Sequence, residues 1–272
     1  MRKVRGDLKN AILEDCPDGD ITSEGSVSRD AKSKGVVVAK EGMTLAGLEI
    51  FREIMKLVDR KTELKLHFKD GDTVLKGKKI ISFSGKSRSI LKGERVALNY
   101  LQRMCGIATV TARFVNEVKG TKALILDTRK TTPNMRALEK YAVRCGGGVN
   151  HRFSLSDVPL IKENHIVAAG GIMNAVKGIK KQKRVKVILE VTNKREVMEG
   201  MEAGAEILLL DNMTPAQVKE MVKIIGKSAL VEVSGGVNLK NVRSYAKAGA
   251  DRISVGAITH SAPSADLSLV FI

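Results

Sequence analysis

Positively charged side chains are concentrated in one part of the chain, directly after an apolar run that is typical of a buried strand. The first group lies in Leu126-Asp127-Thr128-Arg129-Lys130, and further cations follow in Asn150-His151-Arg152 and at Lys162. These residues stand among glycine, proline and asparagine, which are typical of loops. Cations gathered at the end of a strand predict a site for a small molecule that carries several negative charges.

Carboxylates recur farther along the chain, at Glu190, Asp211 and Glu232, which are 21 residues apart. Each lies at or near the C-terminal end of a short apolar run. A β/α repeat of this length closes most simply into a parallel barrel, whose C-terminal rim would carry these acids. Beside cations they could bind the hydroxyls of a sugar or a metal ion. Any single one could instead cap a helix or pair with a lysine, and Glu232 is the least certain member.

Two glycine-containing segments stand at the ends of the last predicted strands, Ser234-Gly235-Gly236 and Val255-Gly256-Ala257. Glycine lets the backbone approach a ligand closely, and exposed backbone N–H groups favour phosphate. Parallel barrels often bind phosphate in the loops after their seventh and eighth strands. The pair of loops therefore predicts a phosphate site.

The elements that would position these residues are short, continuous apolar strands separated by helical segments. Such strands are typical of a sheet that is buried on both faces. Thr214-Pro215 predicts the start of one helix, over 214–225, with an N-cap followed by proline. The predicted strands are 123–126, 185–189, 207–210, 229–233 and 252–255.

The first 100 residues have a different pattern, in which extended runs at 35–39, 64–68 and 79–83 alternate with turn signals. Apolar residues at helical spacing predict a helix within 45–58 that covers this small sheet. Residues 91–118 read as one or two helices, with Cys105-Gly106 as the interruption. A sheet with helices on one face is the α+β pattern.

Composition limits the class of protein. The chain has 272 residues, 43% of them hydrophobic, and can bury a full core. It contains no apolar run of 18 residues and no signal-peptide pattern, so we expect a cytoplasmic protein with no membrane partner. The three cysteines, Cys16, Cys105 and Cys145, lack the spacing of a zinc site or a disulfide framework, and Cys145 is expected to be a buried structural thiol.

The net charge of +17 allows three interpretations: a nucleic-acid surface, a solvated lysine-rich surface, or a positive field that steers anionic substrates. Aromatic residues make up 3% of the chain, with no tryptophan, which leaves few rings for stacking on bases. The lysine-rich surface is therefore favoured, and no nucleic-acid partner is expected.

The amino-acid sequences of several motifs resemble those of the quinolinate phosphoribosyltransferase family, whose members are also called carboxylating nicotinate-nucleotide pyrophosphorylases. The match runs in order from about residue 19 to residue 260. The motifs are Gly19-Asp20-Ile21-Thr22, Gly93-Glu94-Arg95-Val96-Ala97-Leu98-Asn99, Cys105-Gly106-Ile107-Ala108-Thr109, Asp127-Thr128-Arg129-Lys130-Thr131-Thr132-Pro133, Gly146-Gly147-Gly148, Asn150-His151-Arg152, Ile161-Lys162-Glu163-Asn164-His165, Leu210-Asp211-Asn212-Met213, Val233-Ser234-Gly235-Gly236 and Val255-Gly256-Ala257-Ile258-Thr259-His260.

The resemblance implies an α/β fold with an N-terminal α/β sandwich domain at residues 1–100, which the tail 263–272 could join, and an incomplete parallel α/β barrel at 101–262. It also implies a homodimer with shared active sites, which could assemble further. The implied reaction converts quinolinate and phosphoribosyl pyrophosphate into nicotinate mononucleotide, pyrophosphate and carbon dioxide, with Mg²⁺, in NAD biosynthesis.

The resemblance also implies roles for individual residues. Those that would hold quinolinate are Arg95 (from the neighbouring subunit), Thr128, Arg129, His151, Arg152 and Lys162. Those that would hold phosphoribosyl pyrophosphate are Lys130, Glu190, Asp211, Ser234, Gly235, Gly236, Val255, Gly256 and Ala257. Lys130, Glu190 and Asp211 would be catalytic, and the two acids could reach the metal through substrate or water.

Some positions leave alternatives open. His151 could be a structural histidine as readily as a ligand contact, and His165 and His260 are expected to support or pack. Asn134, Phe153-Ser154 and 191–193 depart from the usual family pattern. A related phosphoribosyltransferase is the nearest alternative, either a paralogue associated with molybdate transport or a nicotinate-using enzyme. A basic nucleic-acid-binding protein is the alternative from another class.

Overall fold

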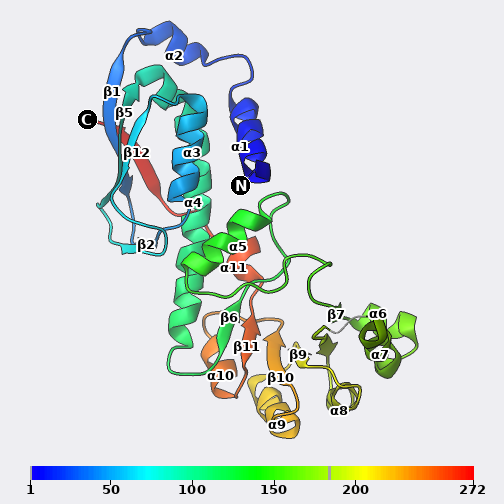
Figure 1. The fold of residues 1–272 in the computed structure, drawn as a ribbon. Helices are drawn as coiled ribbons and strands as arrows, with labels where there is room; N and C mark the ends of the chain where they lie inside the picture. Colours follow the sequence, from blue (N-terminus) through cyan, green and yellow to red (C-terminus); the bar gives the residue numbers. More distant parts are fainter. Residues whose placement is uncertain (1, 183–184) are drawn as a thin grey trace. The chain divides into compact units, whose positions relative to one another are not determined.

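The computed structural model describes residues 2–182 and 185–272. They form two compact units, which Figure 1 shows as ribbons and which are described here one at a time. The first unit combines the chain up to Ala112 with Thr132–Gly147 and Ser261–Ile272, and the second combines Arg113–Thr131 with Gly148–His260. The domain boundaries that the sequence suggests stay a prediction.

An antiparallel sheet of four strands forms the first unit, and each strand run predicted in this part of the chain is present. Burial does not alternate strictly along these strands: Val36 and Val37 are buried in succession, and so are Ile80 and Ile81. The C-terminal strand pairs along its whole length with the strand Lys32–Ala39. In spatial order the strands are β12 (Leu267–Phe271), β1 (Lys32–Ala39), β5 (Lys79–Lys86) and β3 (Glu63–Leu66).

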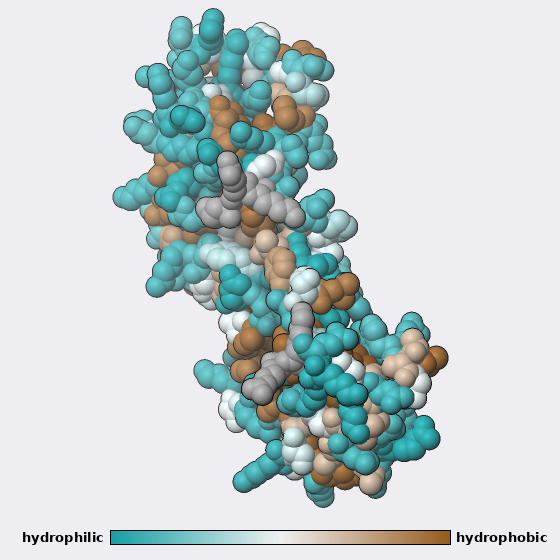
Figure 2. Space-filling model, turned by 45° about the vertical axis from the view of Figure 1, so that its right-hand side comes forward, coloured by the Kyte–Doolittle hydropathy of each residue, from teal (hydrophilic) through white to brown (hydrophobic). Residues whose placement is uncertain are grey.

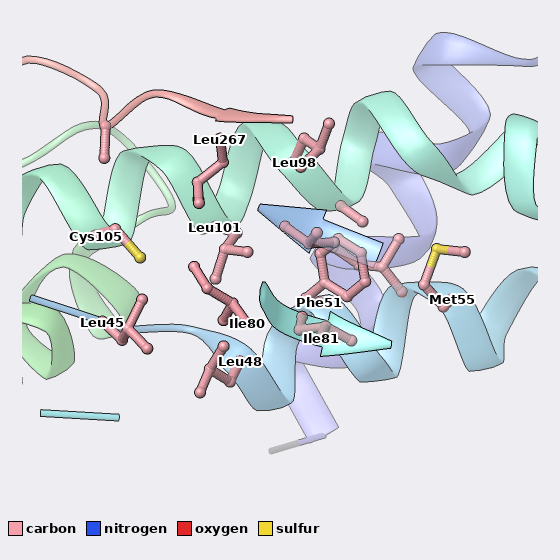
Figure 3. Packing of buried hydrophobic residues seen from close by; sticks show 14 of the residues in the cluster. Leu45, Leu48, Phe51, Met55, Ile80, Ile81, Leu98, Leu101, Cys105 and Leu267 are labelled. Atoms are coloured by element: carbon pink, nitrogen blue, oxygen red, sulfur yellow. The ribbon is translucent and has the colours of Figure 1, made fainter. Parts of the chain in front are cut away.

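Helices α3 (Leu48–Val58) and α4 (Ser87–Glu117) pack on one face of this sheet. The helix predicted within 45–58 is confirmed, and it begins at Leu48 because Gly47 has a left-handed backbone, with φ of +97°. Figure 3 shows Phe51 of α3 and Leu101 of α4 meeting the strand residues Ile80 and Ile81. Burial of these apolar side chains is the main favourable term in the folding of this unit.

The predicted interruption at Cys105-Gly106 is wrong, because α4 runs without a break through these residues. A Cβ atom added to Gly106 would lie 1.9 Å from the carbonyl oxygen of Pro263. Glycine is therefore needed here for close approach of the C-terminal segment and not to end the helix. A glycine inside an apolar pattern can mark either the end of a helix or a close approach of another segment, and the sequence alone does not distinguish the two.

The first unit contains further short elements around the sheet and the two packed helices. Tyr141 donates a hydrogen bond to Asp70 at 2.8 Å, and Asp70 accepts one from the backbone N–H of Leu48 at 3.1 Å. The Asp70 carboxylate thus caps the first turn of α3 from a distant part of the chain. The further elements are α1 (Arg2–Asp15), α2 (Ile21–Ser26), β2 (Met43–Thr44), β4 (Thr73–Val74) and α5 (Arg136–Cys145).

The second unit is built on a parallel sheet of six strands, and the predicted fold class is confirmed. Strands β6 and β7 are the edges, so the barrel is incomplete, although Val149 continues the β6 edge through a parallel bridge to Leu126. The sequence did not predict the two-residue strand β7. In spatial order the strands are β6 (Leu124–Leu126), β11 (Arg252–Ser254), β10 (Leu230–Ser234), β9 (Ile207–Asp211), β8 (Ile188–Val191) and β7 (Leu160–Ile161).

Helices alternate with these strands along the chain, as the β/α pattern predicts. The helix predicted at 214–225 is confirmed, and Thr214 and Gln217 cap it reciprocally. Gly204 and Gly249 follow two of the helices with positive φ, which lets the chain turn into the next strand. The helices are α6 (Glu163–Ala169), α7 (Ile172–Gln182), α8 (Lys194–Glu202), α9 (Pro215–Ile225), α10 (Val242–Lys247) and α11 (Ala257–His260).

Hydrophilic side chains predominate on the face drawn in Figure 2, and hydrophobic residues appear there in smaller groups. This agrees with a lysine-rich composition in which the cations are spread along the chain. In the part of the chain that the structure describes, no helix is long and apolar enough to cross a membrane.

Candidate functional site

A pocket of about 740 Å³ opens in the second unit where the parallel strands end. All six strands lead into it, because the C-terminal ends of parallel strands meet at one edge of their sheet. It is lined by Thr128, Arg129, Lys130, His151, Arg152, Leu160, Lys162, Glu190, Leu209, Asp211, Asn212, Glu232, Ser234, Gly235, Gly236, Val237, Ser254, Val255, Gly256, Ala257 and His260.

Two guanidinium groups, those of Arg129 and Arg152, share one side of the pocket. Burial lowers the pKa of Arg152, the charge of Arg129 lowers it further, and the Glu190 carboxylate opposes both effects. Mutual repulsion between two cations in a partly buried site is relieved when an anion binds between them. Two arginine forks can each grip a carboxylate through parallel hydrogen bonds, so this side suits a dicarboxylate.

Lys162 follows β7 and forms an ion pair with the Glu190 carboxylate, which β8 contributes. The ammonium group is half exposed and the carboxylate is largely buried, with side-chain exposures of 49% and 17%. Lys162 is also the residue before α6, where the ring of His165 accepts a hydrogen bond from its backbone N–H at 3.1 Å. His165 therefore caps a helix, in agreement with the supporting role expected for it.

The end of β9 brings a second carboxylate, Asp211, into the pocket. Its neighbour Asn212 has a left-handed backbone, with φ of +56°, and donates a side-chain hydrogen bond to Asp211 at 2.8 Å. The Asn212 backbone N–H donates to Ser234 at 2.9 Å, which joins the ends of β9 and β10. Asparagine tolerates this conformation better than most residues, which explains an Asn at this position.

The two glycine segments form the adjacent part of the lining. Gly235 and Gly236 both have positive φ, and the side chain of Asn212 lies where a Cβ of Gly235 would be. Lys130 extends over Gly256, since an added Cβ there would meet its Cδ at 3.1 Å. The Lys130 carbonyl accepts a hydrogen bond from Thr259 at 2.7 Å, which fixes the backbone of this lysine. A cation beside exposed backbone N–H groups is suited to phosphate.

His151 is buried at the floor of the pocket, and both of its ring nitrogens are engaged. Nδ1 accepts a hydrogen bond from the backbone N–H of Arg152 at 2.7 Å, and Nε2 lies 3.0 Å from the Glu232 carboxylate. This is the pattern of a neutral ring that carries its proton on Nε2. Glu232 also accepts from Ser254 and lies beside Arg252.

Burial raises the pKa of Glu232, but the hydrogen bond from His151, the charge of Arg252 and the hydrogen bond from Ser254 outweigh that effect. The net result is a pKa below the ordinary value for a glutamate. A buried carboxylate with these partners remains ionised at neutral pH. The rim acid that the sequence left least certain is thus a buried structural anion under the pocket.

The pocket contains every residue that the resemblance assigned to substrate except one. Arg95 lies exposed on α4 in the first unit and is not among the residues that line the pocket. The sequence did not assign Asn212, Ser254 or His260 to the site. The first two could have been inferred from their position next to Asp211 and Val255 at predicted strand ends.

Two of the cysteines, Cys105 and Cys145, are not activated. Burial raises the pKa of Cys105 to about 12 and that of Cys145 to about 11. Thiolates are the reactive form of cysteine, so neither side chain is a nucleophile at neutral pH. Cys145 is partly exposed, contrary to the buried thiol that the sequence favoured.

Within residues 2–182 and 185–272, no three His, Cys, Asp or Glu side chains gather in a way that could hold a metal ion. The pocket offers the two carboxylates Glu190 and Asp211. Mg²⁺ commonly binds through one or two carboxylates together with water and substrate phosphates. The residues present are compatible with a magnesium ion that arrives with a phosphorylated substrate.

Comparison with known proteins matches almost the whole chain to one family. Residues 20–105 match the N-terminal domain model, and residues 107–270 the C-terminal domain model, of quinolinate phosphoribosyl transferase. A Bacillus subtilis protein named as a probable carboxylating nicotinate-nucleotide pyrophosphorylase is 39% identical over 264 residues, covering 96% of this chain and 91% of its own length.

Two further relatives give the same result. The decarboxylating quinolinate phosphoribosyltransferase 1b of Nicotiana tabacum is 36% identical, over 98% of this chain and 81% of its own length. The solved structure of the nicotinate-nucleotide pyrophosphorylase from Francisella tularensis superposes with a TM-score of 0.95 at 37% identity, and the match covers 100% of this chain and 96% of that one.

Proposed function

Because the chain belongs to the quinolinate phosphoribosyltransferase family, it is a decarboxylating phosphoribosyltransferase of NAD synthesis, and we propose that the pocket at the strand ends binds both substrates. One observation carries this proposal. Four cations and two carboxylates face a single pocket of about 740 Å³: Arg129, Lys130, Arg152, Lys162, Glu190 and Asp211. This combination suits a dicarboxylate and a phosphorylated sugar held side by side.

Quinolinate would lie on the side of the pocket that holds Arg129, Arg152 and Lys162. Its two carboxylates need several cations at different angles, and the pair of guanidinium groups supplies two planar forks. When quinolinate binds, its carboxylate can attract the half-exposed ammonium group of Lys162 away from Glu190, because the ammonium group then has a second anion to pair with. Thr128, at the base of the same loop, would complete this subsite.

Phosphoribosyl pyrophosphate would lie toward the glycine segments. The 5′-phosphate suits the backbone of Ser234, Gly235 and Gly236 and that of 255–257, where no large side chain covers the N–H groups. Lys130 stands beside the second segment and would bind the pyrophosphate. Glu190 and Asp211 would accept hydrogen bonds from the ribose hydroxyls.

The chemistry requires positioning and charge and does not require a nucleophilic side chain. The ring nitrogen of quinolinate forms a bond to the anomeric carbon while the bond from that carbon to pyrophosphate breaks, and pyrophosphate leaves with the electron pair. The ribose becomes positive in the transition state, so the carboxylates of Glu190 and Asp211 stabilise it. The ring nitrogen is then cationic. Carbon dioxide leaves the adjacent ring carbon, the electrons move toward that nitrogen, and the carbon takes up a proton.

We propose Mg²⁺ as the cofactor, held by substrate phosphates with Glu190 and Asp211 directly or through water. A bound magnesium ion supplies charge stabilisation for the leaving pyrophosphate. The chain's own contribution is to bring two carboxylates and Lys130 into one pocket, so that the metal and the cation would share the negative charge of one substrate. The cytoplasmic location stays a prediction.

We propose that the active unit is a homodimer in which Arg95 from a second copy of the chain completes the quinolinate subsite. The support is that Arg95 is exposed on α4 and is not among the pocket-lining residues of its own chain. Mixing two inactive variants, Arg95→Ala and Arg129→Ala, tests this. Random reassociation should restore roughly one quarter of wild-type activity, because half of the dimers are mixed and each holds one intact site. No recovery in mixtures that demonstrably exchange subunits would contradict the shared site.

Turnover with alternative acceptors tests the function itself. The purified protein is supplied with phosphoribosyl pyrophosphate, Mg²⁺ and either quinolinate or nicotinate, and both nicotinate mononucleotide and carbon dioxide are measured. We expect equal amounts of the two products from quinolinate and negligible mononucleotide from nicotinate. Efficient use of nicotinate would instead assign the chain to the alternative acceptor class. Arg129→Ala should abolish turnover while thermal unfolding remains close to that of the wild type.

A further inference from the structure

Two fully buried carboxylates hold the segment that carries His151 and Arg152. Asp127 accepts hydrogen bonds from the backbone N–H of His151, at 2.9 Å, and from the side chain of Asn150. Glu232 lies 3.0 Å from the His151 ring, on strand β10. Burying a carboxylate is costly unless its oxygens accept hydrogen bonds from fixed donors. The donors of the 150–152 segment therefore stabilise the two buried carboxylates, and the carboxylates in turn fix the position of that segment.

The His151 ring is the link between Glu232 and Arg152. Its Nε2 faces the carboxylate, and its Nδ1 accepts the hydrogen bond from the Arg152 backbone N–H. The guanidinium of Arg152 is anchored at its other end by a hydrogen bond to the Val158 carbonyl, at 3.2 Å. With both ring nitrogens engaged, His151 has no ring N–H or lone pair left to offer a substrate carboxylate in this arrangement.

We propose that Glu232 is a positioning residue for the carboxylate subsite: it orients the His151 ring, and the ring fixes the backbone from which Arg152 reaches the substrate. His151 is then a connecting residue and not a direct hydrogen-bond partner of quinolinate. The inference rests on the proposed function, because it concerns the subsite that holds quinolinate. It assigns a role to an acid that borders the pocket but whose side chain is fully buried.

The neighbouring Arg252 does not account for Glu232 by itself. Nε of Arg252 and Oε2 of Glu232 are 3.0 Å apart, yet neither atom has a hydrogen-bond partner among the described residues. Their geometry gives attraction between charges without a directed bond. The directed contacts of the carboxylate are those with His151 and Ser254, both on its other oxygen. A carboxylate kept for charge neutralisation alone would not need this orientation toward the ring.

A double-mutant cycle tests the proposal through the equilibrium dissociation constant of quinolinate, measured by calorimetry. Glu232→Ala should raise this constant about tenfold, as loss of one hydrogen bond involving a charged group does. Glu232→Gln retains an acceptor for Nε2 and should stay within about threefold of the wild type. In an Arg152→Ala background, Glu232→Ala should have almost no further effect, because the side chain through which it acts is absent.

If Glu232→Ala does not fold, the same cycle is run with His151→Phe, which preserves the ring and removes both nitrogens. If the effects of His151→Phe and Arg152→Ala on the dissociation constant of quinolinate are not additive in free energy, the proposal is supported. If the two effects are independent and multiply, the proposal is overturned. The KM for phosphoribosyl pyrophosphate should remain within about twofold of the wild-type value in each folded single variant. If the KM for phosphoribosyl pyrophosphate rises by the same factor as the dissociation constant of quinolinate, the variant has lost structure generally, and this result would also overturn the proposal.

Asp251→Ala is the matched control. Like Glu232, this carboxylate accepts a hydrogen bond and pairs with a cation: it accepts from the backbone N–H of Val231 at 2.8 Å and pairs with Lys122, but it lies at the opposite ends of β10 and β11. It should lower stability without changing quinolinate affinity. Failure of the wild-type protein to bind quinolinate would contradict the proposed function, whereas binding with an additive cycle would contradict this inference alone.

Discussion

Gly235→Ala should damage the phosphate loop far more than the same change one residue later. The added Cβ would lie 2.2 Å from Oδ1, 2.6 Å from Cγ and 2.9 Å from the backbone N of Asn212, at a position where φ is +90°. Gly236→Ala also places alanine at a positive φ, of +62°, but its Cβ meets nothing within 4 Å. The two variants share the backbone penalty and differ in the collision.

The expected magnitudes follow from these contacts. A left-handed backbone costs an L-residue about 1–2 kcal/mol, and this is the whole effect expected for Gly236→Ala. Overpacking adds about 1–3 kcal/mol, which gives roughly 2–5 kcal/mol for Gly235→Ala. The Asn212 side chain can rotate away, but its backbone N cannot do so without disturbing the hydrogen bond to Ser234. Moving Asn212 would also remove its hydrogen bond to Asp211.

Thermal unfolding and steady-state kinetics with each substrate varied in turn measure both consequences. Gly235→Ala should have the larger loss of thermal stability and the larger rise in KM for phosphoribosyl pyrophosphate, while quinolinate affinity changes little. Equal losses in the two variants would show that the contact with Asn212 is not what requires glycine. A rise in KM confined to quinolinate would refute the assignment of this loop to phosphate binding.

Three further predictions concern charge, pH and packing. Lys162→Gln should raise the KM for quinolinate at least tenfold, whereas Lys194→Gln, which breaks a lysine–carboxylate pair exposed on both sides and outside the pocket, should leave the kinetics unchanged. The lowered pKa of Glu232 stabilises the fold above the ordinary glutamate pKa of 4.5, and this contribution is lost as the pH falls through the folded-state value. The melting temperature of Glu232→Gln should therefore fall less steeply than that of the wild type in acid, and parallel curves would contradict this. Gly106→Ala should destabilise through its 1.9 Å contact with a backbone oxygen, whereas Gly178→Ala, in an unobstructed helical position, should stabilise by up to about 1 kcal/mol.

The elements that the sequence predicted well are those whose pattern is local. The barrel strands are continuous apolar runs, and the helix over Pro215–Ile225 begins at the expected cap. Strand β7 was missed because two residues are too few for any periodicity. The break expected at Gly106 was wrong because the reason for that glycine is a segment more than 150 residues later in the chain.

The site was predictable where function depends on residue type at a strand end. Arg129, Glu190 and Asp211 follow the predicted strands 123–126, 185–189 and 207–210, and parallel strands bring such positions to one edge. The relation between His151 and Glu232 could not be read from the sequence. It depends on how the segment after Val149 is placed against strand β10, which decides whether the Glu232 carboxylate meets substrate or a buried ring.

A crystal structure of the protein with quinolinate would show whether one pocket binds both carboxylates of this acid. We expect quinolinate to contact Arg129, Arg152 and Lys162, with the His151 ring still hydrogen-bonded to Glu232 and to the Arg152 backbone. Quinolinate bound outside the pocket that these three cations line would refute the proposed binding mode.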